Sequence, residues 1–348
     1  MIPKIPAGHM RRMRSSKKAV FEVQFNWIFI LIAGGVFLFL FLSIVSSQKK
    51  AADQSVNAEL LSKVDSLIAG SASSFQSSKT VSLPSVQLDV ICDADHESAL
   101  QVSGSLSKRT PIQAIYARPH VDTKHLMIFT DAYEAGFGIA PILYLSGANT
   151  NYLLINDTTA NEKFVAKIFS LFPENVTKVV HASPDASYPK QADETVFVKI
   201  GPGACPTPFS GALCVLVTPS SPGDDTAGTV QFCASSSSCS PSQGYAGLPM
   251  LKGAIVSADN TSYACTSGKL LERQSILATL ALNRTQQYIS SGKLSLDCNT
   301  TYTSIKLPLR NLVLARDLSN SQTIYSSSKS LSVLNEDLIR GTRCPLLY

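Results

Sequence analysis

Three residues in the middle of the chain, His120, Asp122 and His125, have the types and spacing of a possible metal site. Imidazole and carboxylate groups are common metal ligands, and a turn is able to gather residues at this spacing. The structural alternative is an exposed polar loop beside Pro119, which needs no ion. We favour the loop, and the sequence predicts no cofactor.

A second polar cluster lies directly after the first cysteine and consists of Asp93, Asp95, His96 and Glu97. Adjacent residues on a strand point to opposite faces, so these four do not converge on one ion if they are extended. His96-Glu97 begins the zinc-protease pattern H-E-x-x-H, but position 100 is leucine and the pattern fails. We interpret the cluster as a solvated loop.

Other patterns that carry chemistry are incomplete. Asp224 and Asp225 lie in a Pro/Gly-bounded loop without the regular acidic spacing of a calcium site. The sequence contains no G-x-S-x-G elbow and no phosphate-binding loop. Arg273 and Arg284 are able to face a partner or an anion, although arginine on an amphipathic helix usually lies at its solvent edge. We therefore favour a non-enzymatic protein, and an envelope hydrolase assembled from distant residues stays an alternative.

The most informative element is an apolar segment near the N-terminus. No charged residue occurs from Val23 to Gln48, and residues 27–45 are almost wholly apolar. A bilayer core about 30 Å thick needs roughly 20 apolar residues at 1.5 Å each, so we predict a transmembrane helix over residues 24–47 that contacts the lipid bilayer.

The charge distribution predicts the orientation of this helix. Residues 1–48 contain six basic residues and one acidic residue, whereas the remaining chain contains 24 of each. The positive-inside rule then predicts a cytoplasmic segment over residues 1–23 and an extracellular C-terminal portion in a single-pass cell-membrane protein. Because that portion is neutral, the sequence argues against nucleic-acid binding and favours an unidentified surface or envelope partner.

Eight cysteines follow the apolar segment, and the preceding residues contain none: Cys92, Cys205, Cys214, Cys233, Cys239, Cys265, Cys298 and Cys344. This distribution is typical of a disulfide framework in an oxidising compartment. We expect short bridges Cys205–Cys214 and Cys233–Cys239, while the other four cysteines allow three connectivities. Five glycosylation sequons also fit an exposed ectodomain: Asn156, Asn175, Asn260, Asn283 and Asn299.

The pattern of the extracellular portion predicts an α+β fold. We expect a stalk and linker over residues 48–82, then a mixed-sheet ectodomain over residues 83–261. Its amphipathic helix at residues 160–172 is followed by strand candidates, which indicates a βαβ unit. The last of these strand candidates is Leu251–Val256.

Residues 262–348 are predicted to form helices packed on the ectodomain. A long helix spans about residues 263–289, and one face is expected to carry Leu270, Leu277, Leu280, Ala281 and Tyr288. A second helix is expected to carry Pro308 in its first turn, and a third is expected to end at Gly341, just before Cys344.

Both ends of the chain resemble a family of uncharacterised single-pass surface proteins from DPANN archaea. The likeness lies in the basic N-terminus with Phe21, Glu22, Phe25 and Trp27 and in the C-terminal pattern Tyr263-x-Cys265, Cys298, Cys344-Pro345. The central part resembles that family only loosely. The resemblance implies topology and disulfides, and it implies no reaction.

The N-terminus also suggests a pilin-like filament subunit as an alternative function. Pilin precursors carry a short basic leader and then an apolar helix with a glutamate near its start, which is where Glu22 lies. The glutamine-rich processing motif of archaeal pilins is absent, and Lys17-Lys18-Ala19-Val20-Phe21 occupies its place. A glutamate at a helix N-terminus is also favourable through the helix dipole alone.

Overall fold

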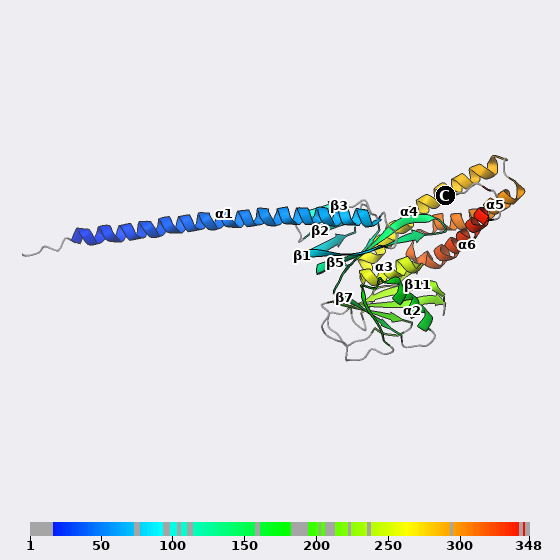
Figure 1. The fold of residues 1–348 in the computed structure, drawn as a ribbon, viewed down its shortest axis with the longest axis horizontal. Helices are drawn as coiled ribbons and strands as arrows, with labels where there is room; N and C mark the ends of the chain where they lie inside the picture. Colours follow the sequence, from blue (N-terminus) through cyan, green and yellow to red (C-terminus); the bar gives the residue numbers. More distant parts are fainter. Residues whose placement is uncertain are drawn as a thin grey trace, which may run out of the picture. The chain divides into compact units, whose positions relative to one another are not determined.

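The computed structural model describes residues 17–72, 77–92, 98–102, 106–109, 114–156, 161–181, 194–201, 203–205, 213–221, 224–234, 238–292, 295–340 and 344. The chain divides into two compact units, Met1–Val56 and Asn57–Tyr348. Helix α1, Lys17–Ala72, contributes residues to both units (Figure 1).

The first unit contains the apolar part of α1. Its large apolar side chains from Trp27 to Val45 are 44% to 74% exposed. Within the described ranges, α1 is the one helix long and apolar enough to cross a membrane. Because the protein itself does not cover these side chains, a lipid environment suits them.

The second unit contains two six-stranded sheets. The first has the strand order β3-β2-β1-β5-β6-β4, and the second has the order β12-β11-β10-β9-β7-β8. The strands of the first sheet are β1 (Ser78–Ile91), β2 (Ala99–Val102), β3 (Leu106–Arg109), β4 (Ile115–Tyr116), β5 (His120–Glu134) and β6 (Gly138–Gly147). Those of the second are β7 (Thr150–Ile155), β8 (Thr177–His181), β9 (Glu194–Ile200), β10 (Leu213–Ser221), β11 (Asp224–Cys233) and β12 (Gln243–Ala246).

Both sheets are mixed. The first is antiparallel except where β4 pairs in parallel with β6. In the second, β7 pairs in parallel with β8 across helix α2 (Glu162–Leu171), which is the predicted βαβ unit. The α+β class with mixed strands, C-terminal helices and disulfides is confirmed, although the strands form two sheets and not one.

Residues 57–72 differ from the predicted stalk and linker. Four apolar side chains of this stretch are buried against the first sheet: Leu60, Leu61, Val64 and Ile68. They share a core cluster with strand residues that include Leu88, Val121 and Leu126. The amphipathic spacing therefore reflects packing within the second unit, and β1 begins at Ser78, inside the predicted linker.

The predicted strand Leu251–Val256 is wrong, because these residues belong to helix α3, Leu248–Ser257. A short apolar run does not distinguish a buried strand from a buried helix, since neither leaves a polar face. Pro249 in the first turn is the local signal for a helix that the strand prediction passed over.

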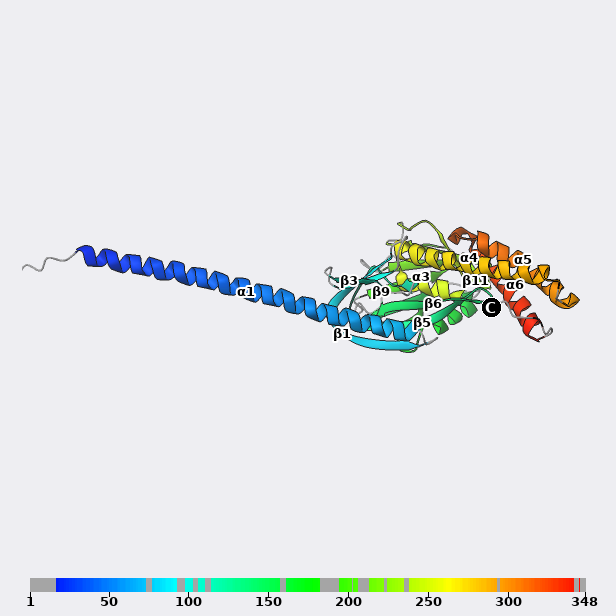
Figure 2. The same ribbon diagram turned by 90° about the horizontal axis from the view of Figure 1, so that it is seen from above.

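Three long helices follow: α4 (Asn260–Ser290), α5 (Leu296–Leu314) and α6 (Ser321–Arg340), the last preceded by the short 3₁₀ helix η2 (Leu318–Asn320). They lie side by side in both views (Figure 1 and Figure 2). The prediction that Pro308 lies in a first turn is wrong, because α5 begins at Leu296 and Pro308 is in its interior. The Ser295 side chain accepts a hydrogen bond from the Cys298 amide, which caps the true start.

Four disulfides connect the described elements. The bridges are Cys92–Cys265, Cys205–Cys214, Cys233–Cys239 and Cys298–Cys344. Cys92–Cys265 joins the end of β1 to α4, and Cys298–Cys344 joins α5 to the chain beyond α6. The sequence left these two pairings open. The expected short bridges Cys205–Cys214 and Cys233–Cys239 are confirmed. Gly341 lies outside the described residues.

Candidate interaction surface on helix α4

The structure does not gather the three metal candidates around a common point, and the loop that we favoured is wrong, because His120, Asp122 and His125 lie in strand β5. The His120 Nδ1 atom lies 2.7 Å from an oxygen of Asp89, and Ser82 lies 3.2 Å from the Nδ1 atom of His125. Asp122 is paired in register with Gln87 on the neighbouring strand. Over the described part of the chain, no group of three or more His, Cys, Asp or Glu side chains is arranged to hold a metal ion.

The side chains of several other candidate residues lie outside the described part of the chain. Residues 93–97 lie outside the described residues, and the side chains of Asp224 and Asp225 do as well, although their backbone belongs to β11. The Glu22 side chain also lies outside the described residues.

A buried ion pair that sequence reasoning missed joins α3 to the first sheet. The Lys252 Nζ atom donates to Asp131 over 2.8 Å and lies over the rings of Phe129 and Tyr144. Burial lowers the pKa of Lys252, and the Asp131 charge acts in the opposite direction. The side chain of Lys252 is 5% exposed and that of Asp131 is 21% exposed, so we assign the pair a structural role at the edge of the core.

Polar contacts between sheet and helix fix the rotation of α4 about its axis. The hydroxyl of Tyr116 lies 2.8 Å from that of Ser267, and the hydroxyl of Tyr133 donates to Gln274 over 3.0 Å. Burial raises the pKa of both tyrosines. These contacts hold the face of α4 with Ser267 and Gln274 against the core, and the Cys92–Cys265 bridge attaches the first turns of α4 to the end of β1 from another side.

The connection after α5 fixes a second side of α4. The Ser275 hydroxyl donates to the carbonyl oxygen of Val313 over 2.9 Å, and Arg316 Nε donates to the same hydroxyl over 3.0 Å. Thr279 in turn donates to the Ser275 carbonyl oxygen over 2.7 Å. These bonds therefore fix the rotation of α4 relative to α5.

The remaining face of α4 points to solvent and is partly apolar. Ile276 and Leu280 are 56% and 60% exposed. The expected packed face included Leu280, and this prediction is wrong, because the helical rotation of 100° per residue carries Leu280 away from Leu270 and Ala281.

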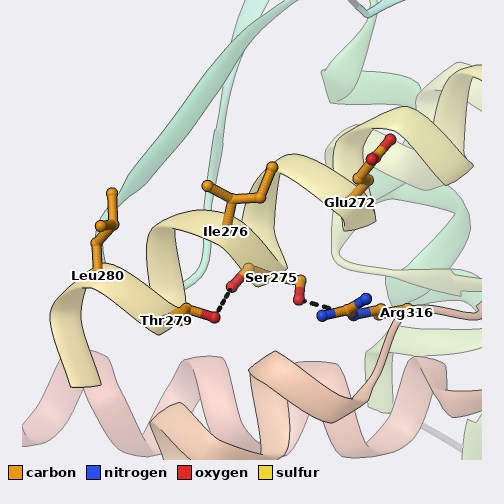
Figure 3. A pocket seen from close by; sticks show the side chains of 6 residues that line it. All are labelled: Glu272, Ser275, Ile276, Thr279, Leu280 and Arg316. Atoms are coloured by element: carbon orange, nitrogen blue, oxygen red, sulfur yellow. Dashed lines mark hydrogen bonds between the residues drawn. The ribbon is translucent and has the colours of Figure 1, made fainter. Parts of the chain in front are cut away.

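A pocket of about 220 Å³ lies on this face and is lined by Glu272, Ser275, Ile276, Thr279, Leu280 and Arg316 (Figure 3). Glu272, Ile276 and Leu280 form one edge, while Ser275 and Thr279 form the other (Figure 3). Arg316, from the chain after α5, lies beside Ser275, so the pocket is a groove between the exposed row of α4 and the connection that follows α5 (Figure 3). Such a groove accepts a row of side chains from another helix.

Other apolar side chains are exposed on the neighbouring helices. Leu296, Leu307 and Leu314 on α5 are 66% to 81% exposed, and Val333 and Ile339 on α6 are 55% and 62% exposed. Single exposed apolar residues are common in proteins. On α4, the exposed pair Ile276 and Leu280 borders a pocket.

The five sequons lie in different surroundings. Asn283 is exposed on α4, one turn beyond Thr279, and Asn299 is exposed on α5. The Asn175 side chain bonds to Ser78 and Thr80, Asn156 is half-buried at the end of β7, and Asn260 opens α4 with a buried side-chain oxygen. A glycan on Asn283 would lie at the end of the groove.

Comparisons with protein families, with curated proteins and with solved structures give no match for this chain. The class of protein therefore follows from the structure alone. A long exposed apolar helix and a domain with four disulfides suggest a membrane-anchored extracellular protein.

A second periodic row in the sequence marks the outer surface of α4. Residues 272, 276, 280 and 284 repeat every four positions as acidic, apolar, apolar and basic. Such a row lies on one side of a helix. It becomes recognisable as a surface only when the buried face of α4 is known.

Proposed function

We propose that this chain is a single-pass surface module that acts by association through helix α4 and does not act as an enzyme. Residues 24–47 anchor it in the membrane, the N-terminus lies in the cytoplasm, and the disulfide-bonded unit lies outside the cell. The basic flank before the apolar segment and the neutral charge of the rest support this orientation. The resemblance of both ends to DPANN surface proteins supports the same topology.

The observation that carries this proposal is the groove beside Ile276 and Leu280. The inner face of α4 is held by hydrogen bonds from Tyr116 and Tyr133, so these two side chains cannot reach the core by rotation of the helix. An exposed apolar pair beside a groove on a fixed helix is the arrangement that a helix of a partner fits. A role in partner binding or envelope structure follows.

The proposal is tested by replacing both apolar side chains with lysine in the full chain and extracting the protein mildly from its membranes. Native gel electrophoresis should show wild-type protein in an assembly larger than one copy and the Ile276→Lys/Leu280→Lys variant as a single copy. Leu307→Lys is the matched control, because Leu307 is 66% exposed on α5 and lies outside the groove. Equal migration of all three proteins would contradict the proposal.

The orientation is tested separately on intact cells. A protease added outside should degrade the disulfide-bonded unit and leave a fragment that contains the N-terminal tag and the apolar segment. A tag that is lost while the unit stays protected would reverse the assigned topology.

A further inference from the structure

Two of the four disulfides lie next to each other in the second sheet. The bridges Cys205–Cys214 and Cys233–Cys239 are neighbours because Cys214 in β10 and Cys233 in β11 are directly opposed in the antiparallel register. We propose that the two bridges form a thiol-exchange site, which is independent of the α4 surface. A small thiol opens Cys233–Cys239 at Cys239, and Cys233 then bonds to Cys214 and releases Cys205.

Cys233 lies between two other cysteines. On one side it faces Cys214 across the pair of strands β10 and β11, and on the other side it faces its disulfide partner Cys239 in an isolated antiparallel bridge. Directly opposed residues of antiparallel strands project to the same face of the sheet, with Cβ atoms about 4.5–5.5 Å apart. A disulfide needs a Cβ separation of about 3.5–4.5 Å, so a shift on the order of 1 Å allows Cys233 to bond to Cys214 instead of Cys239.

Strand pairing keeps Cys214 and Cys233 opposed when the short bridges open. The register of β10 and β11 runs without a shift from this pair to Pro219 and Gly228, and β10 also pairs with β9 on its other side. The side chains around the site form one buried cluster, which consists of Leu153, Ile155, Phe197, Cys205, Cys214 and Cys233. Groups that a fixed scaffold holds next to each other react at a high effective concentration.

Solvent exposure selects the sulfur that an outside thiol attacks. Cys239 is exposed, whereas the other seven cysteines are buried or half-buried, and its partner Cys233 is only 3% exposed. Thiol–disulfide exchange begins with the attack of a thiolate on an accessible disulfide sulfur. An outside thiol therefore attacks Cys239 and leaves the thiolate on Cys233, inside the buried cluster and beside the Cys205–Cys214 bridge.

The exchange balances with one thiol and needs no external oxidant or reductant. The incoming thiolate forms a mixed disulfide with Cys239 and breaks the Cys233–Cys239 bond. The Cys233 thiolate then forms a bond to Cys214 and breaks the Cys205–Cys214 bond, and the proton of the incoming thiol passes to the Cys205 sulfur. Two disulfides and one thiol are present before and after the reaction. Both short loops are opened, while β10 and β11 become covalently linked.

Treatment of the full chain in its membranes with reduced glutathione tests this exchange. Free thiols are then blocked with N-ethylmaleimide, and the peptides are analysed by mass spectrometry without reduction. We expect glutathione on Cys239, maleimide on Cys205 and a peptide pair linked through Cys214 and Cys233. Maleimide on Cys233 should reach less than about one tenth of the level on Cys205, because the adjacent disulfide captures the Cys233 thiolate at a high effective concentration.

The internal control is the Cys298–Cys344 bridge, whose two residues are buried and which should stay intact. Maleimide on Cys233 together with an intact Cys205–Cys214 bridge would overturn the inference, because the opened bridge would then not transfer. The absence of glutathione from Cys239 would overturn it as well.

A pair of matched variants provides a second readout. Cys205→Ser/Cys239→Ser keeps Cys214 and Cys233 together with the two long-range disulfides, so the denatured protein should bind no maleimide. Cys205→Ser/Cys233→Ser keeps Cys214 and Cys239, which lie on opposite sides of position 233, and it should bind maleimide at both cysteines. Maleimide at Cys214 and Cys233 in the first variant would show that these two residues do not form a bridge, and it would overturn the inference.

Discussion

Helices α3 and α4 are both rich in apolar residues, but they use them differently. In α3, all eight residues from Met250 to Ser257 are buried. In α4, one face is buried by the sheet while Ile276 and Leu280 remain more than half exposed. The same residue types therefore stabilise the folded chain in α3 and are available for association in α4.

The difference arises from what surrounds each helix. Helix α3 contacts both sheets and is followed directly by α4, so it has no face left for solvent. Helix α4 contacts the first sheet, α3 and α5, while Ile276 and Leu280 on its outer side remain exposed. Substitutions should therefore affect folding in α3 and assembly on the outer face of α4.

The largest expected effect is a loss of folding stability at alkaline pH, and it acts on the buried core. Burial raises the pKa of Tyr116, Tyr144 and Tyr263, so the unfolded chain loses these protons first as the pH rises above about 10. The folded state then binds more protons than the unfolded state, and its stability falls with increasing pH. We expect a loss of up to about 1.4 kcal/mol per pH unit for each tyrosine, measured by denaturant unfolding between pH 8 and 11. A constant unfolding midpoint across this range would contradict the buried aromatic core.

Removing one partner of the buried ion pair should have the next largest effect. Asp131→Ala leaves the Lys252 ammonium group without its partner in the core and should cost about 3–5 kcal/mol of unfolding free energy. Lys252→Met/Asp131→Ala should recover much of this loss, because a neutral side chain carries no desolvation penalty there. Equal stability of the single and double variants would show that the pair is not buried as a unit.

Two glycines provide a matched test of the two helices. A Cβ atom at Gly253 in α3 would lie 2.7 Å from the Tyr116 ring, so Gly253→Ala should destabilise the fold by about 1–3 kcal/mol. A Cβ atom at Gly268 in α4 would meet nothing within 4 Å, so Gly268→Ala should stabilise the helix by about 0.5–1 kcal/mol. Thermal unfolding of both variants measures the difference. Stability changes of the same sign in both variants would contradict the difference in packing between α3 and α4.

Truncating the outer apolar pair should have the smallest effect on folding. Ile276→Ala and Leu280→Ala should each change the unfolding free energy by less than about 0.5 kcal/mol, because both side chains are exposed. The measurement is denaturant unfolding of the full chain in detergent at a concentration where it is a single copy. A loss above about 2 kcal/mol in this state would place these side chains in the core.

The fold was more predictable than the surface. Long periodic segments, the apolar helix and the short-range disulfides are local signals, and the structure contains them. The strand predicted at Leu251–Val256 failed because a helix buried on all sides has no polar period to detect. The division into two sheets depends on long-range pairing that local patterns do not specify.

The α4 surface was missed for a different reason. Leu280 was assigned to the packed face from helical periodicity, and the rotation that exposes it is set by distant contacts such as Tyr133 with Gln274. The ion pair of Lys252 with Asp131 joins residues 121 positions apart, and no local pattern indicates it. The metal candidates His120, Asp122 and His125 are close in sequence, but they do not share a site in the structure.

The most direct test of the account is the mass of the full chain inserted in lipid nanodiscs, measured for wild type and for the Ile276→Lys/Leu280→Lys variant. The account predicts an assembly heavier than one copy for the wild type and a single copy for the variant, with equal unfolding free energies. The same mass for both proteins would contradict the claim that the outer face of α4 is an association surface.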